Sequence, residues 1–219
     1  MARSILDLAY PVKCPSCGKP LTDADGPHAC RKCVSAIRPN PRPPESDPKQ
    51  FSFSVAYSAC MYDGPMKELI HAFKYRRKRI LSKLFSTILS NFVAERAEIS
   101  WDIDALTFVP MHPERRRDRE FNQSELLARG LAEAFSMSAS ALLQKTMRTS
   151  SQNELTREDR LINLRGAFRM NPDAYPITGK RLLLIDDVMT TGATLDECSR
   201  VLAKAGAAEI RCLTLARGI

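Results

Sequence analysis

The sequence predicts an α/β protein, a parallel sheet flanked by helices, with a small four-cysteine unit at its amino terminus. Three observations lead to this prediction. Short apolar runs alternate with stretches of helical periodicity, four cysteines stand in two close pairs, and an acidic pair follows the most apolar run. Strands that alternate with helices favour a parallel sheet covered on both faces.

The chain is long enough for one well-packed domain and a small appendage. It has 219 residues, of which 44% are hydrophobic and 26% are charged. No apolar run is long enough to span a bilayer, and Asp7 interrupts the start of the chain before a signal core could form. We therefore expect a cytoplasmic protein without membrane insertion.

Basic residues outnumber acidic ones by 33 to 25, which gives a net charge of +8. Two patches are dense, one formed by Lys74 with residues 76–79 and one by residues 115–119. Such patches attract polyanions, either phosphorylated metabolites or nucleic acid. A solvated surface would explain each patch equally well.

Residues 1–38 are predicted to form a metal-binding unit. Cys14 and Cys17, and Cys30 and Cys33, are pairs with two intervening residues, and twelve residues separate the pairs. This is the spacing of a tetrahedral four-cysteine zinc site, and clustered thiols in a reducing compartment favour metal binding over disulfides. So small a unit cannot bury a core unaided, so we expect a structural Zn²⁺. Two redox dithiols, or unpaired cysteines, are the alternative.

Residues 39–50 are predicted to be a linker to the larger domain, 51–219. Five prolines between positions 39 and 48 cannot donate backbone hydrogen bonds and hold the chain extended. In the larger domain, periodicity predicts the following elements. They are a strand or hairpin arm over 51–62, one helix or two over 66–95, a strand over 105–111, a helix capped by Asn122, a strand over 182–188, a helix over 195–204 and a strand over 210–216.

Two further segments are predicted to be loops. Pro110 and Pro113 oppose continuation of the strand over 105–111 into a helix, so a basic loop is expected after it. Residues 145–166 are polar and lack apolar periodicity, which indicates a mobile loop.

The most specific signal begins where the strand over 182–188 ends. Asp186 and Asp187 stand at the edge where parallel sheets bind ligands. The chain then turns into a helix whose first N–H groups and partial positive charge suit a phosphate dianion. The turn residues are Thr190, Thr191, Gly192, Ala193 and Thr194. Because carboxylates repel phosphate, the acids should accept hydrogen bonds from sugar hydroxyls, and together the two parts predict a ribose-phosphate site.

The block of apolar strand, acidic pair and Thr-Thr-Gly-x-Thr resembles the fingerprint of type I phosphoribosyltransferases, and no position departs from it. The resemblance implies that fold, with Asp186 and Asp187 on the ribose hydroxyls of 5-phosphoribosyl 1-pyrophosphate and residues 190–194 on its 5-phosphate. An ordinary capped turn after an acidic strand end is the alternative.

The loop after residue 109 is predicted to meet the pyrophosphate, because it leaves the sheet at the same edge as the phosphate turn. Its candidate ligands are Met111, His112 and Arg115. Arginine forks suit phosphate oxygens and stabilise charge on a departing pyrophosphate. For His112, an acid-base role is a weaker hypothesis.

Further short motifs resemble the ComF family, also called the GntX family. They are Tyr62-x-Gly64, Lys74-Tyr75, Val109-Pro110, Phe121-Asn122-Gln123, Ser151-Gln152 and Asn163-Leu164. With the paired cysteines, the resemblance covers nearly the whole chain. It implies a role in taking up or processing DNA during natural transformation, with single-stranded DNA and other competence proteins as candidate partners.

Two features qualify or extend this resemblance. The family usually has Arg-Gly before Phe-Asn-Gln, whereas this chain has Arg119-Glu120, so the loop can bend differently. The resemblance also makes residues 145–169 the loop that closes over the substrate in phosphoribosyltransferases, where Arg148, Arg157 and Arg160 would add positive charge.

Two functions follow from these expectations. In the first, the protein is a phosphoribosyltransferase: Mg²⁺ binds with the pyrophosphate, and Asp186 and Asp187 stabilise positive charge at the anomeric carbon. The sequence names no acceptor, so turnover is left open. In the second, the protein is not catalytic and binds ribose phosphate and single-stranded DNA, with Tyr75 and the basic residues around it as a stacking and charged surface.

Overall fold

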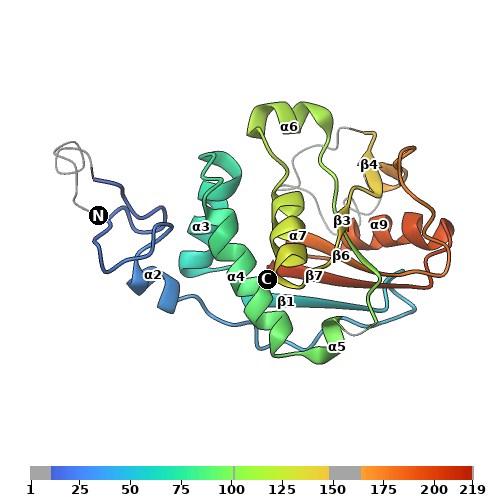
Figure 1. Cartoon of the computed structure of the whole chain (residues 1–219), viewed down its shortest axis with the longest axis horizontal. Coiled ribbons are helices and arrows are strands. Elements are labelled where there is room, and N and C mark those ends of the chain that lie inside the picture. Colours follow the sequence, from blue (N-terminus) through green and yellow to red (C-terminus); the bar gives the residue numbers. More distant parts are fainter. Residues whose placement is uncertain (1–10, 101, 148–163, 219) are drawn as a thin grey trace.

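The computed structural model (Figure 1) describes residues 11–100, 102–147 and 164–218 and contains a five-stranded sheet in the order β1-β7-β6-β2-β3. The strands are β1 (Val55–Met61), β2 (Ala105–Phe108), β3 (Ala139–Ser140), β6 (Arg181–Met189) and β7 (Glu209–Arg217). Every neighbouring pair is parallel. The predicted parallel sheet is therefore confirmed, and the carboxyl ends of its strands meet at one edge.

Helices cover both faces of this sheet (Figure 1). The helices of the described residues are α2 (Arg31–Ser35), α3 (Gly64–Tyr75), α4 (Leu81–Ala94), α5 (Ala97–Ser100), α6 (Pro113–Arg119), α7 (Gln123–Ala134) and α9 (Ala193–Lys204), of which α2 belongs to the cysteine unit and α6 lies beyond the sheet. Successive residues of a strand point to opposite faces. Leu183 and Ile185 of β6 pack with α3, α4 and α7, whereas Leu182 and Leu184 pack with α9. The sheet is thus the middle of three layers.

A second, two-stranded sheet lies beside α9. Its strands, β4 (Leu143–Lys145) and β5 (Phe168–Met170), pair antiparallel. Three-residue strands are too short to show a periodicity, so the sequence did not predict them. Most of the loop predicted over 145–166, including Arg148, Arg157 and Arg160, lies outside the described residues.

Residues 39–50 run along β1, the edge strand of the sheet. The backbone N–H of Asn40 donates to Ala59 at 3.0 Å, and Glu45 and Ala56 exchange hydrogen bonds of 3.0 and 2.8 Å. Proline is tolerated at such an edge, and the contact covers backbone groups that a second chain could otherwise pair with. The predicted linker therefore packs against the larger domain.

Two local predictions need correction. The basic segment after Met111 was expected to be a loop, but residues 113–119 form helix α6. Proline is favourable in a first helical turn, where its missing N–H is not needed, and His112 caps the helix by accepting from the backbone N–H of Glu114 at 3.4 Å. The strand expected over 105–111 ends at Phe108.

Helices α4 and α7 cross closely at Gly130. A Cβ atom at this position would lie 2.1 Å from Ser86 Oγ and 2.7 Å from Ser86 Cβ. Such separations are far below van der Waals contact, so the crossing requires a residue without a side chain.

We predict that Gly130→Ala lowers the free energy of unfolding by about 1–3 kcal/mol, although alanine is the better helix former. Urea denaturation of the variant and the parent chain measures this. Adding Ser86→Gly removes both atoms that meet the new methyl group and should recover most of the loss. An unchanged stability for Gly130→Ala alone would contradict the close crossing.

Candidate functional site

The carboxyl ends of β2 and β6 open into a cavity of about 280 Å³. All the sequence-predicted ligand residues outside the cysteine unit line this cavity, which places them within reach of one ligand. They are Met111, His112, Arg115, Asp186, Asp187, Thr190, Thr191, Gly192, Ala193 and Thr194.

The turn between β6 and α9 depends on Gly192. This residue is the N-cap of α9 and has a φ of +82°, a left-handed conformation that glycine adopts without strain. A Cβ atom there would also lie 3.0 Å from side-chain atoms of Met189 and Phe51. The N–H groups of the first turn of α9 have no acceptor within the helix, so this end of the cavity can bind an anion.

Asp187 is paired with Lys74 at the end of α3. The Lys74 Nζ donates to Asp187 Oδ1 at 2.6 Å, and the two side chains are only 18% and 12% exposed. Burial is the largest single effect and acts to lower the pKa of Lys74, but the charge and hydrogen bond of Asp187 and the charge of Asp186 together outweigh it, and the net shift is upward. The ammonium therefore stays charged and fixes the carboxylate beside the cavity.

Asp186 is held differently, by neutral donors. Ser124 Oγ donates to Asp186 Oδ1 at 2.7 Å, and the backbone N–H of Asp187 donates to the same oxygen at 2.8 Å. Asn122 sets the position of Ser124, because its side chain accepts from the backbone N–H of Ser124 at 3.1 Å and donates to Val109 O at 3.0 Å. Burial, and then the charge of Asp187, raise the pKa of Asp186 to about 7. This carboxyl therefore exchanges its proton near neutral pH.

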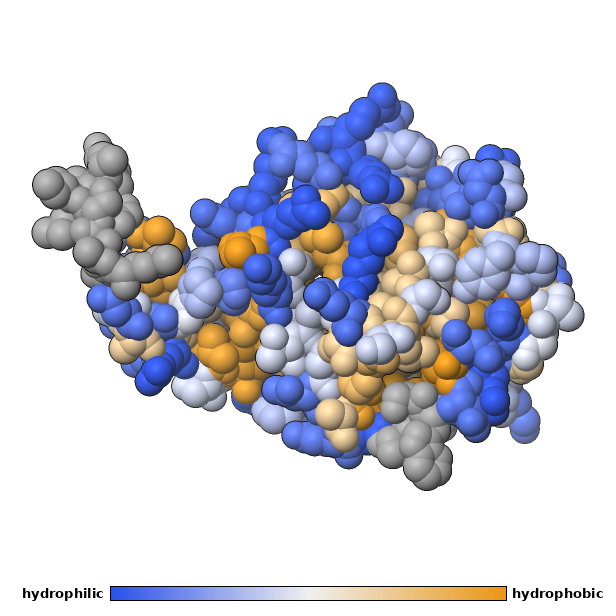
Figure 2. All heavy atoms as spheres, viewed as in Figure 1, coloured by the Kyte–Doolittle hydropathy of each residue, from blue (hydrophilic) through white to orange (hydrophobic). Residues whose placement is uncertain are grey.

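Positively charged side chains outnumber acids on the cavity wall. Lys74, Arg115, Arg119 and Lys145 line it together with the two aspartates. Burial, and then the positive charge of Arg115, lower the pKa of Lys145. Close cations of this kind suit a ligand that carries several negative charges. Hydrophilic residues also gather over α6, at the end of the molecule where that helix lies (Figures 1 and 2).

Sequence reasoning missed several lining residues. Gln123 was noted only as part of a family motif, and Ser124 only as part of the helix capped by Asn122. The one available signal of a ligand role was that this helix begins at the sheet edge where the cavity lies. Lys74 was assigned to a surface patch, because its partner lies 113 positions away in the sequence. For Lys145, the short strand β4 gives no pattern to interpret.

Glu120 takes a left-handed backbone conformation, with φ 69° and ψ −19°, where α6 ends. Glycine adopts this conformation most readily, and glycine is the residue that the resembled family usually has here. The Glu120 carboxylate pairs with Arg77 across a 2.5 Å contact. Glu120 therefore keeps the backbone conformation that glycine favours and adds an ion pair to the segment that connects α3 and α4.

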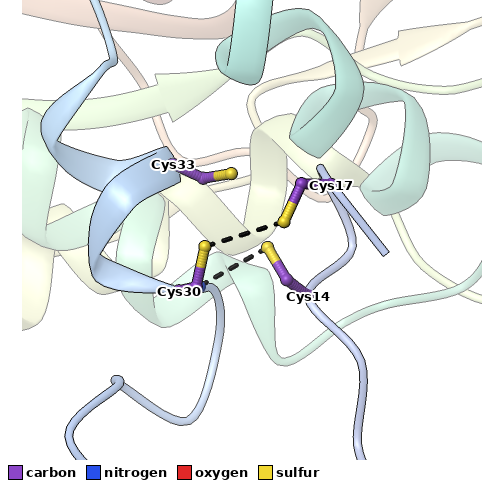
Figure 3. Close-up of side chains that lie close together, drawn as sticks. All are labelled: Cys14, Cys17, Cys30 and Cys33. Carbon is purple, nitrogen blue, oxygen red and sulfur yellow. Dashed lines mark hydrogen bonds between the residues drawn. The ribbon is translucent and has the colours of Figure 1, made fainter. Parts of the chain in front are cut away.

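The four cysteines of the amino-terminal unit lie together. Their side chains point toward one another from residues 14–17 and 30–33 (Figure 3), with all four sulfurs within 4.8 Å of each other. Cys17 Sγ and Cys30 Sγ are 3.8 Å apart, and the backbone N–H of Cys30 donates to Cys14 Sγ at 3.4 Å. Zn–S bonds of about 2.3 Å in a tetrahedron place sulfurs about 3.8 Å apart. The cluster therefore fits a structural metal ion.

In the part of the chain that the structure describes, no helix is both long and apolar enough to cross a bilayer.

Because Asp186 and Asp187 are held differently, replacing each by asparagine should change the free energy of unfolding in opposite directions. Because the pKa of Asp186 is raised from 3.8 to about 7, the folded protein holds a proton between these values that the unfolded chain releases. Stability contributed by this group is present at low pH and is lost as the pH rises through 7. Asp186→Asn should therefore raise the free energy of unfolding at pH 8 and change it little at pH 4. We expect an increase of about 1–2 kcal/mol, less than the full pKa shift would give, because water in the open cavity screens the charge.

Asp187→Asn should instead lower the free energy of unfolding at pH 8 by about 2–3 kcal/mol, because it leaves the ammonium of Lys74 buried without its partner. Urea denaturation at both pH values measures the two variants side by side. A change of the same sign for both at pH 8 would contradict the different roles assigned to them.

Part of the chain matches a known protein family and resembles solved structures. A family model described as "Phosphoribosyl transferase domain" matches residues 123–219. The glutamine phosphoribosylpyrophosphate amidotransferase of B. subtilis is 21% identical, over 64% of this chain and 26% of that chain, with a TM-score of 0.38. A hypoxanthine phosphoribosyltransferase of Staphylococcus aureus is 15% identical, over 62% and 64% of the two chains, with a TM-score of 0.41.

Curated relatives cover more of the chain. The DNA utilization protein YhgH of Escherichia coli is 32% identical over 207 residues, which are 93% of this chain and 83% of that protein. Competence protein F of Haemophilus influenzae is 31% identical over 159 residues, 71% of this chain and 69% of that protein. The residues matched by the family model, 123–219, include the acid pair, the phosphate turn and strand β6. The chain therefore belongs to the ComF family of competence proteins and carries a phosphoribosyltransferase-type domain.

Proposed function

We propose that the cavity binds 5-phosphoribosyl 1-pyrophosphate with Mg²⁺ and that the protein is a phosphoribosyltransferase that acts in DNA uptake or processing during natural transformation. The observation that carries the proposal is the shared cavity of an acid pair and a helix N-terminus. The N–H groups at the start of α9 suit the 5-phosphate. Asp186 and Asp187 each have one oxygen engaged by a protein donor, which leaves the second oxygen of each to accept from the ribose hydroxyls.

The pyrophosphate is proposed to lie against Met111, His112 and Arg115. Arg115 and Lys145 bring positive charge to this wall, where negative charge would accumulate on a departing pyrophosphate. The Nδ1 atom of His112 already accepts the backbone N–H of Glu114, so we assign His112 a positioning role. As the bond from the anomeric carbon to the pyrophosphate oxygen breaks, its electron pair leaves with the pyrophosphate. The acid pair stabilises positive charge on the carbon until the acceptor, a nucleophile, supplies the electron pair of the new bond.

The donors around the cavity fit a Mg²⁺ that arrives with its ligand. Mg²⁺ is usually bound by one or two carboxylates together with substrate phosphates and water. The second oxygen of Asp186 and of Asp187, which accepts from a ribose hydroxyl, has a further lone pair that could bind the metal ion. When bound, the metal ion would neutralise charge on the pyrophosphate.

Calorimetric titration with 5-phosphoribosyl 1-pyrophosphate and Mg²⁺ tests this proposal. The parent chain should bind, and Asp186→Asn should weaken binding at least about tenfold, because one hydrogen bond to a charged acceptor is worth about 1.5–3 kcal/mol. Since this variant is expected to be more stable, weaker binding cannot be attributed to unfolding. Asp173→Asn, an exposed carboxylate that does not line the cavity, is the matched control. No binding by the parent chain at millimolar ligand would contradict the proposal.

A non-catalytic protein that binds ribose phosphate and single-stranded DNA is the second candidate. The observation in its favour is Tyr75, which is 58% exposed and adjoins the basic residues 76–79. An exposed ring beside cations suits stacked, unpaired bases. If the protein binds 5-phosphoribosyl 1-pyrophosphate but releases no pyrophosphate with any of the candidate acceptors, this function is favoured over the first.

Single-stranded DNA binding has its own test. Replacing residues 76, 77 and 79 by glutamate should abolish salt-sensitive binding of an oligonucleotide in a fluorescence anisotropy titration. The variant with both Asp186→Asn and Asp187→Asn should keep that binding. Equal loss in both variants would contradict a separate DNA surface.

We also propose that the ion held by the four cysteines is a structural Zn²⁺. The cysteines would belong to a unit formed by residues 1–38, which the linker 39–50 joins to the domain 51–219. Four thiolates at tetrahedral spacing leave no open coordination position, and the cytoplasm would keep them reduced.

The purified protein should therefore contain one zinc ion per chain by elemental analysis. A chelator should unfold the amino-terminal unit, because so small a unit has too little apolar surface to fold without metal. Limited proteolysis with and without chelator detects this as new cleavage within residues 11–38, with the Cys60→Ser chain, whose altered cysteine lies outside the cluster, as control. Unchanged protection after complete zinc removal would contradict a structural role.

A further inference from the structure

Helix α9 carries a buried acid, Glu197, about one turn after Ala193, where the helix begins. Only 6% of the surface of Glu197 is exposed. Arg200 donates to both carboxylate oxygens, from Nε to Oε2 at 2.7 Å and from Nη2 to Oε1 at 2.6 Å. The backbone N–H of Gly166 also donates to Oε1, at 2.8 Å. The side chain therefore joins α9 to the segment that leads into β5.

The Glu197 carboxylate is charged in this position. Burial acts to raise its pKa, but the hydrogen bonds from Arg200 and Gly166 and the positive charge of nearby arginines together outweigh burial, and the net shift is downward. A hydrogen bond to an ionised acceptor is stronger than one between neutral groups. The contact with Gly166 is therefore a strong link between α9 and the small sheet of β4 and β5.

This small sheet depends on α9 for its position. Both of its strands have three residues, and an isolated two-stranded sheet is at best marginally stable. Phe168 of β5 belongs to the same apolar cluster as Leu195 and Cys198 of α9, beside which the sheet lies (Figure 1). Apolar contacts are not directional. The hydrogen bond from Gly166 to Glu197 is directional, so it sets where the small sheet lies along the helix.

Lys145 of β4 takes its position from the same sheet. It pairs with Phe168 in the strand register, and its Nζ lies 5.2 Å from the centre of the Phe168 ring. Lys145 also lines the cavity. Burial, and then the charge of Arg115, lower the pKa of Lys145, while the charge of Asp186 acts in the opposite direction. A chain of contacts thus runs from Glu197 through the small sheet to a cation of the cavity wall.

We propose that Glu197 is a positioning residue, which holds Lys145 at the wall where the pyrophosphate is proposed to lie. The inference rests on the proposed function, because it concerns one end of that ligand. Helix α9 would then serve both ends of it. Its N-terminus binds the 5-phosphate, and Glu197 sets the distance from there to a cation that meets the pyrophosphate. Displacing Lys145 should therefore weaken binding of 5-phosphoribosyl 1-pyrophosphate and leave binding of ribose 5-phosphate unchanged.

Two conservative variants separate the link to Gly166 from the ion pair with Arg200. Glu197→Asp keeps the charge but is one methylene shorter, which withdraws the acceptor from Gly166. Glu197→Gln loses the charge but keeps an oxygen acceptor at the same reach. Calorimetry measures the affinity for 5-phosphoribosyl 1-pyrophosphate with Mg²⁺ relative to that for ribose 5-phosphate. This ratio should fall at least about threefold in Glu197→Asp and less than about twofold in Glu197→Gln, with ribose 5-phosphate binding unchanged in both.

A double variant shows whether Glu197 acts through Lys145. Lys145→Ala should lower the ratio about tenfold or more, since a hydrogen bond between charged groups strengthens binding by this order. Adding Glu197→Asp to Lys145→Ala should lower it no further. Glu209→Asp is the matched control, because Glu209 also pairs with an arginine, Arg211, and does not line the cavity. Its ratio should equal that of the parent chain.

A larger loss in Glu197→Gln than in Glu197→Asp would assign the effect to the ion pair with Arg200 and overturn the inference. An unchanged ratio in Glu197→Asp, equal weakening of both ligands, or additive losses in the double variant would overturn it as well. In these cases the parent chain still binds 5-phosphoribosyl 1-pyrophosphate, so the proposed function stands. If the parent chain does not bind this ligand, the proposed function fails, and the inference fails with it.

Discussion

The buried ion pair between Lys74 and Asp187 is the interaction on which the rest of the site depends. Two adjacent carboxylates at a strand end would repel each other, and the charge of Lys74 offsets one of them at 2.6 Å. The same contact ties the end of α3 to β6, so that Tyr75 lines the cavity beside Lys74. The Lys74–Asp187 ion pair thus lowers the net charge of the two aspartates and fixes the position of one cavity wall.

Around this pair, the site is arranged for ligand binding at the expense of stability. Asp186 is held by neutral donors, so burial raises its pKa to about 7 and the folded state is less stable when it ionises. Among the residues that the structure describes, the buried Gln123 Nε2 finds no hydrogen-bond partner. Cations outnumber acids on the wall. Each of these features is unfavourable for folding, and a ligand with hydroxyls and phosphates would offset the charges of the acids and the cations.

Sequence patterns predicted those parts of the structure that local chemistry determines. The strand over β6, the turn around Gly192 and the spacing of the cysteines depend on neighbours in the chain, and the structure has them where they were expected. Helix α6 was predicted to be a loop, because prolines were interpreted as breaking a helix that Pro113 in fact begins. The partners of the acid pair could not be predicted, since Lys74 and Ser124 are 113 and 62 positions from the aspartates they contact. Such pairings arise from the packing of helices on the sheet.

The most direct measurement is a crystal structure of the protein grown with 5-phosphoribosyl 1-pyrophosphate and Mg²⁺. The account predicts the 5-phosphate within hydrogen-bond distance of the backbone N–H groups at the start of α9, with the ribose hydroxyls on Asp186 and Asp187. The ion pair with Lys74 should persist in the complex. A ligand whose 5-phosphate lies on Arg115 and Lys145, with the turn at 190–194 empty, would contradict the account.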